Sequence, residues 1–179
     1  MRFGLFEVAG SLHRITDEDL CANGGVVHAD MIYSMATRVC DNDKWLLHEY
    51  CLPKAAHFRG FVDRARLKDR DLLTGLLVTL VHEVYTHGEV EYIHPLFKSW
   101  FEDKFNIHHD DVRKVVAWVT VHTGGTESNH FAHATDAVQR FSDITGTAIM
   151  IDDAVSVFCD YLDAKFAVMN ELEALLHAH

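Results

Sequence analysis

The apolar and polar residues of this chain alternate with the period of α-helices. Between residues 148 and 176, apolar positions recur at spacings of three and four residues, as in Ile151, Val155, Phe158 and Leu162. The same period predicts further helices over roughly residues 17–39, 42–66, 69–101, 110–122 and 126–142. Six or seven helices with short connections predict an all-α, antiparallel helical bundle.

Polar residues continue the apolar face of the helix predicted over residues 69–101. The line through Leu80 and Val84 reaches His87, Glu91 and His94 by further steps of three and four residues. On a buried face, unpaired carboxylates and imidazoles cost on the order of several kcal/mol each. Glu91 and His94 are therefore predicted metal ligands.

The helix predicted over residues 126–142 repeats this arrangement. Glu127 and His130 have the same i, i+3 spacing as Glu91 and His94, and they also lie on an apolar line. Two Glu-x-x-His pairs on facing helices can chelate two metal ions, and carboxylate with imidazole suits iron or manganese. A hydrogen-bonded network of His and Glu without metal, and a metal-free catalytic pocket, are the alternatives.

Several further residues are candidates for the same site. His87 is expected to be a fifth ligand or a proton donor, and Glu83, four residues before it, is the second candidate catalytic group. Glu49 and His57 share a face of the helix predicted over residues 42–66, where either could complete the ligand set. Two more histidines lie on apolar lines and are weaker candidates: His28 and His122.

Composition narrows the class of protein. The 179 residues suit one domain spanning 1–179, and the formal charge of −11 argues against nucleic acid and anionic membranes as partners. Fourteen histidines are far more than an average chain of this length carries. The cysteines form no CxxC pair and are interpreted as small core residues of a reduced, cytoplasmic protein: Cys21, Cys40, Cys51 and Cys159. No signal peptide and no membrane-spanning run is evident.

The two Glu-x-x-His pairs and the run from Glu91 to Phe97, read as EYIHPLF, resemble the haem-oxygenase-like di-metal oxidases, a superfamily that includes the TenA and PqqC proteins. The resemblance implies an all-α bundle whose di-iron centre activates O₂. A ferritin-like bundle is the alternative, for which Glu49 would supply a single Glu ligand.

The function expected from these observations is O₂-dependent oxidation of a small organic substrate by a non-haem di-iron protein. One alternative is a non-catalytic bundle that binds iron or senses O₂. Another is a metal-free, TenA-like hydrolase, for which Cys51 or Cys159 would be the nucleophile. The long apolar line over residues 148–176 also predicts a homodimer.

Overall fold

A computed structural model describes residues 4–20, 25–47, 51–69, 71–105, 109–123 and 125–178. These residues form helices and no strand, which confirms the predicted all-α class. The α-helices are α1 (Phe6–Asp19), α2 (His28–Cys40), α3 (Pro53–Asp63), α4 (Leu72–Phe105), α5 (His109–Val115), α6 (Ala117–Val121), α7 (Gly125–Thr145) and α8 (Ile151–His177). A 3₁₀ turn, η1 (Lys44–Leu46), precedes α3, and a π-helical turn, η3 (Arg64–Lys68), follows it.

Three of the predicted helices differ from the observed ones, and one of them, expected over residues 110–122, is divided at Val116 into α5 and α6. The helix expected over residues 17–39 is divided, because α1 ends at Asp19 and α2 begins only at His28. Gly25, in the connection, has a φ of 143°, a conformation that a helix cannot contain. The helix expected from residue 42 begins at Pro53, whose fixed φ and missing N–H suit the first helical turn. Pro95, by contrast, lies inside α4.

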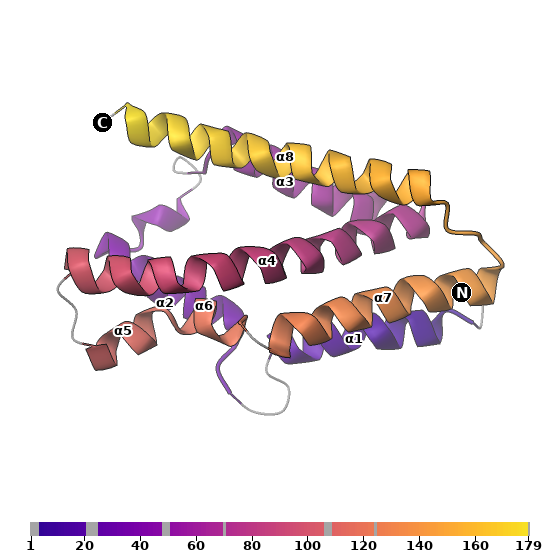
Figure 1. The fold of residues 1–179 in the computed structure, drawn as a ribbon, viewed down its shortest axis with the longest axis horizontal. Coiled ribbons are helices and arrows are strands. Elements are labelled where there is room, and N and C mark those ends of the chain that lie inside the picture. Colours follow the sequence, from indigo (N-terminus) through magenta and orange to yellow (C-terminus); the bar gives the residue numbers. More distant parts are fainter. Residues whose placement is uncertain are drawn as a thin grey trace.

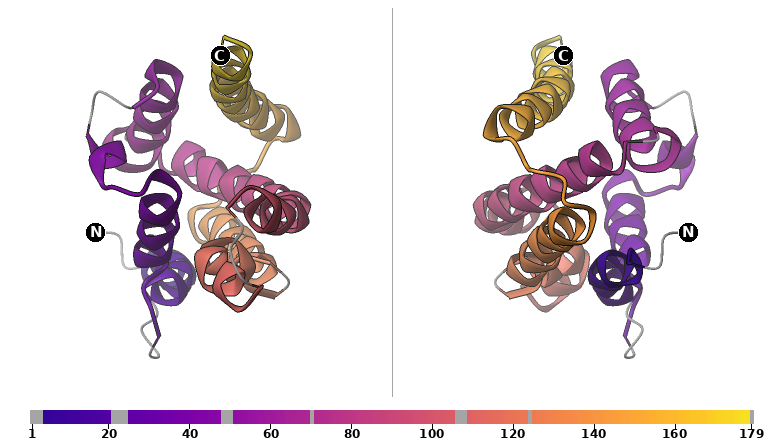
Figure 2. Two further views of the ribbon diagram at one scale, coloured as in Figure 1. Left: turned by 90° about the vertical axis from the view of Figure 1, so that its left-hand side faces the viewer. Right: turned by 90° about the vertical axis from the view of Figure 1, so that its right-hand side faces the viewer.

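Helix α4 runs through the middle of the molecule (Figures 1 and 2). Helices α3 and α8 lie on one side of it. On the other side, α1 and α7 lie along its N-terminal half, and α2, α5 and α6 lie along its C-terminal half. Helix α4 therefore has neighbours on two faces.

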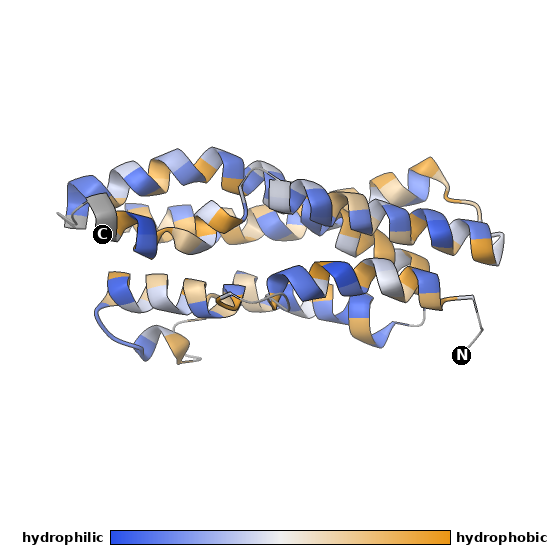
Figure 3. Cartoon of the chain, turned by 90° about the horizontal axis from the view of Figure 1, so that it is seen from below, coloured by the Kyte–Doolittle hydropathy of each residue, from blue (hydrophilic) through white to orange (hydrophobic). Residues whose placement is uncertain are grey.

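The hydrophobic core lies on both sides of α4. Polar residues are interspersed with apolar ones along every helix (Figure 3). One cluster joins α4 to α1 and α7 through Leu76 and Leu77, and a second joins it to α3 and α8 through Val78 and Val81. The single apolar line predicted for this helix is consequently incomplete, and Val84, predicted to be buried, is 42% exposed. A helix between two layers buries two stripes, which a one-face pattern does not anticipate.

The cysteines do not lie in the core as predicted. Cys40, Cys51 and Cys159 are exposed free thiols, and Cys21 lies outside the described residues. Among the described helices, none combines the length and the apolar composition that a membrane span requires.

Candidate metal centre

Four helix ends meet beside the middle of α4 (Figure 1). Helix α1 ends there at Asp19, α2 begins at His28, α6 ends just before His122, and the first turn of α7 contains Glu127. Glu83 faces this junction from α4. The acidic Glu127 suits its position, because the N-terminus of a helix carries a partial positive charge.

The first of two triads at this junction consists of Glu83, Glu127 and His130. Each offers one ligand atom, and these atoms all lie within 4.8 Å of one another. The three residues are buried, with exposed fractions of 6%, 1% and 2%. His130 Nδ1 lies 3.5 Å from Glu83 Oε2 and 3.8 Å from Glu127 Oε2, so the imidazole stands between the two carboxylates.

The second triad consists of Asp19, His28 and His122, whose ligand atoms also lie within 4.8 Å of one another. His28 Nδ1 is 3.1 Å from Asp19 Oδ1, and the two imidazole rings lie 4.5 Å apart in an edge-on arrangement. His122 Nδ1 donates a hydrogen bond of 2.6 Å to the Trp118 carbonyl. A neutral imidazole held in this way keeps its Nε2 lone pair for a metal ion.

The two triads adjoin through Glu127. His122 Nε2 of the second triad lies 3.8 Å from Glu127 Oε1, while the other carboxylate oxygen of Glu127 faces His130. A further carboxylate, Glu18, is 3.3 Å from His130 Nε2 and 3.8 Å from His133 Nε2. The junction therefore gathers imidazoles and carboxylates in two adjacent groups that share one central carboxylate.

Burial at the junction shifts the pKa values of its carboxylates and imidazoles, because it removes water that would solvate their charged forms. Burial raises the pKa of Glu127 to about 7, although the nearby His130 opposes the shift. Burial alone would lower the pKa of His130, but its hydrogen bond to Glu83 and the charges of Asp19 and Glu127 raise it overall. Burial lowers the pKa of His122, against the effect of the Trp118 carbonyl.

The polar atoms of the first triad are incompletely satisfied. Within the described part of the chain, neither Glu127 Oε2 nor His130 Nε2 has a hydrogen-bond partner. Buried polar atoms in folded proteins are nearly always hydrogen-bonded or bound to metal. The donor set and the unsatisfied Glu127 Oε2, which lies on the side of His130 Nδ1, therefore fit a metal ion.

The structure brings together only part of the predicted ligand set. Glu127, His130 and the catalytic candidate Glu83 meet, whereas Glu91 is exposed and His94 Nε2 is within 3.1 Å of the Thr120 hydroxyl. Glu91 follows Glu83 by eight residues, or roughly 12 Å along the helix axis. The Glu-x-x-His pair of α4 thus lies beyond the junction.

The remaining predicted site residues differ in their position relative to the two triads. His87 is half-buried and belongs to neither triad, and its buried Nδ1 has no hydrogen-bond partner among the residues described. His57 is exposed on α3, and Glu49 lies outside the described residues. The weaker candidates His28 and His122 form the second triad.

Sequence reasoning missed the contribution of α1, because no separate helix was predicted there. Its last turn carries Glu18 and Asp19, although the C-terminus of a helix carries a partial negative charge that disfavours acidic residues. Three consecutive acids in this unfavourable position, Asp17, Glu18 and Asp19, are the signal in the sequence that points to this end of α1.

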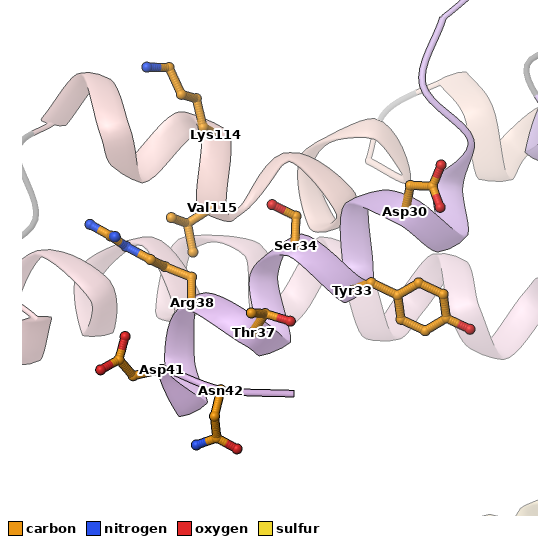
Figure 4. A pocket seen from close by; sticks show the side chains of 9 residues that line it. All are labelled: Asp30, Tyr33, Ser34, Thr37, Arg38, Asp41, Asn42, Lys114 and Val115. Atoms are coloured by element: carbon orange, nitrogen blue, oxygen red, sulfur yellow. The ribbon is translucent and has the colours of Figure 1, made fainter. Parts of the chain in front are cut away.

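Two surface hollows differ in their relation to the triads. A cavity of about 630 Å³ between α1, η3 and α4 is lined by apolar side chains and reaches Asp19 and Glu83. A groove of about 760 Å³ between α2 and α5 is lined by polar residues such as Tyr33, Thr37 and Arg38, and no triad member lines it (Figure 4). Only the first hollow can deliver a ligand to the candidate metal centre.

Comparison of the chain with protein-family models, with curated proteins and with solved structures found no match.

Proposed function

We propose that this chain is a non-haem di-iron protein that activates O₂ to oxidise a small organic substrate. The observation that carries the proposal is the pair of buried His and carboxylate triads that adjoin through Glu127. The ligands would be Glu83, Glu127 and His130 for one ion and Asp19, His28 and His122 for the other. Glu127, which faces both groups, would bridge the ions.

Oxygen and nitrogen donors suit iron or manganese, and the triads contain no thiolate of the kind typical of structural zinc. When bound, a pair of iron ions supplies the electrons that reduce O₂. The protein contributes orientation: the Trp118 carbonyl fixes the ring of His122, and the Asp19 carboxylate lies against His28. Burial of Glu127 and His130 keeps bulk water away from the reacting region.

The neighbouring cavity supports catalysis over iron storage or O₂ sensing. Iron storage needs no binding space for an organic molecule, whereas this cavity reaches one carboxylate of each triad, Asp19 and Glu83. The metal-free hydrolase alternative needs a cysteine in the cavity. Among the residues described, no cysteine lines it, and Cys51 and Cys159 are exposed. The resemblance to haem-oxygenase-like oxidases stays a prediction.

Metal content of ligand variants tests the proposal. Protein purified without oxygen and reconstituted with Fe(II) is expected to hold about two iron ions per chain by elemental analysis. His130→Ala and His28→Ala each remove an imidazole from a different triad and should each lose at least one ion. Glu91→Ala and His94→Ala are the matched controls, because the same residue types lie outside the junction, and they should keep both ions.

Turnover separates an oxidase from a sensor. Wild-type protein should consume O₂ with a substrate-dependent rate, and His130→Ala should not. Trace iron in reconstituted wild type, or equal iron in His130→Ala, His28→Ala and the controls, would contradict the proposal. Reversible O₂ binding without product would favour the sensor.

A further inference from the structure

The cavity beside the triads has one long apolar wall. Along α1, the side chains of Leu5, Val8, Leu12 and Ile15 line it, and Asp19 of the second triad lies at the end of the same face. From Leu5 to Asp19 this wall extends roughly 21 Å at the rise of an α-helix. Its shape suits an elongated apolar group that lies along α1 and ends near the metal ligands.

One cation lines the cavity from η3, outside this apolar wall. Among the described residues that line the cavity, Arg66 is the only Lys or Arg, and no ion pair within 4.0 Å is found for it. Part of its side chain is exposed, yet the atoms packed around the guanidinium lower its pKa, against the opposing charge of Glu83. Arg66 is therefore close to the metal-ligand end of the cavity and free to bind an anion.

Local backbone geometry holds Arg66 in place. It lies in the π-helical turn η3, a kind of helical irregularity that is frequent at functional sites. This turn packs tightly on α4 at Gly75, where an added Cβ would come within 2.9 Å of the Ala65 carbonyl oxygen. The glycine permits the close approach, and the approach sets the position of the Arg66 backbone.

Of the ionisable groups that line the cavity, Arg66 has the greatest influence on whether the cavity favours a negatively or a positively charged ligand. Among the residues that line the cavity, His82 has its Nδ1 2.7 Å from the Tyr161 hydroxyl, so this ring nitrogen already has a partner. Asp19 and Glu83 would be neutralised by metal, and Asp69 is exposed, where solvent screens its charge.

We infer that this cavity binds an elongated apolar molecule with a single carboxylate, which pairs with Arg66 beside the metal ligands while the apolar part lies along α1. This inference rests on the proposed function, because it assigns the substrate class of the same centre. A guanidinium binds a carboxylate through two parallel hydrogen bonds, one to each carboxylate oxygen. A ligand with a hydroxyl or an ammonium group in place of the carboxylate cannot accept this pair of hydrogen bonds.

Calorimetric titration with three molecules of one chain length tests the inference: decanoate, decanol and decylamine, each below its micelle concentration. Iron-loaded wild type should bind decanoate roughly tenfold or more tightly than decanol, and decylamine no better than decanol. Arg66→Gln should abolish the preference for decanoate, and Arg66→Lys should restore part of it. Arg59→Gln removes the same charge from α3, outside the cavity, and should leave the preference unchanged.

Each result decides separately on the inference and on the proposed function. Circular dichroism and iron content are measured on every sample. Protein that holds iron but binds decanoate and decanol equally, or whose preference survives Arg66→Gln, would overturn the inference and leave the proposed function standing. Protein that takes up no iron yet shows the Arg66-dependent preference would overturn the proposed function instead.

Discussion

Replacing Glu127 by Gln should make the metal-free protein more stable at alkaline pH, although it removes a proposed ligand. The Glu127 side chain is 1% exposed, and burial raises its pKa from 4.5 to about 7. Each pKa unit corresponds to about 1.4 kcal/mol, so keeping this carboxylate ionised in the folded state costs about 3 kcal/mol. Gln has nearly the same shape and carries no charge.

The sign follows from proton binding. A raised pKa means that the folded state holds the proton more tightly than the unfolded state. Stability is therefore unaffected by this group below pH 4.5, falls as pH rises from there to about 7, and stays reduced above it. The stability gained by Glu127→Gln should grow by about 2 kcal/mol between pH 5 and pH 8. His130 keeps Glu83 as a partner at 3.5 Å in the variant.

Urea unfolding of chelator-treated wild type and Glu127→Gln at pH 5 and pH 8 measures this difference. Glu173→Gln, on the exposed surface of α8, is the control for a charge change without burial and should show no such trend. Adding Fe(II) should reverse the order, because wild type gains more stability from binding metal than a variant that lacks the carboxylate shared by the two triads. If metal-free Glu127→Gln is less stable than wild type at pH 8, Glu127 is stabilised by contacts that outweigh its desolvation, and the reasoning fails.

Three further predictions follow from packing. Tyr161→Phe removes the hydroxyl that lies 2.7 Å from His82 Nδ1 and should lower the free energy of unfolding by about 1–3 kcal/mol in urea, because a buried polar atom loses its partner. Gly75→Ala should lower the melting temperature, since its Cβ would collide with backbone, whereas Gly60→Ala, in open space on α3, should raise it. The predicted homodimer should give twice the chain mass by light scattering, and Leu172→Glu, on the exposed apolar side of α8, should reduce it to one chain.

Helices with a single buried face could be predicted closely from the sequence. Helices α7 and α8 begin and end within about three residues of the expected positions. On α7 the apolar line also placed Glu127 and His130 toward the interior, where both are buried. A polar residue on such a line faces the same neighbour as the apolar residues around it, so periodicity alone locates it.

The same reasoning fails on α4 because this helix is buried on two faces. When two stripes are apolar, a line drawn through one of them crosses to the other and no longer indicates a single neighbour. Glu91 and His94 lie on such a line, whereas α4 passes the junction earlier, at Glu83. Which turn of a long central helix meets the ends of its neighbours depends on where those neighbours end.

The second triad depends on tertiary structure still more strongly. The apolar lines indicate that His28 and His122 are buried, but they do not indicate that the ends of three helices bring these histidines together with Asp19. Their proximity exists only when α1, α2 and α6 are all docked against α7 and α4. A centre assembled in this way has no partial form in the unfolded chain, so the free energy of metal binding would contribute to folding. In the metal-free protein, repulsion among the buried carboxylates opposes the docking of these helices. A bound metal would remove this repulsion and so stabilise the docked arrangement.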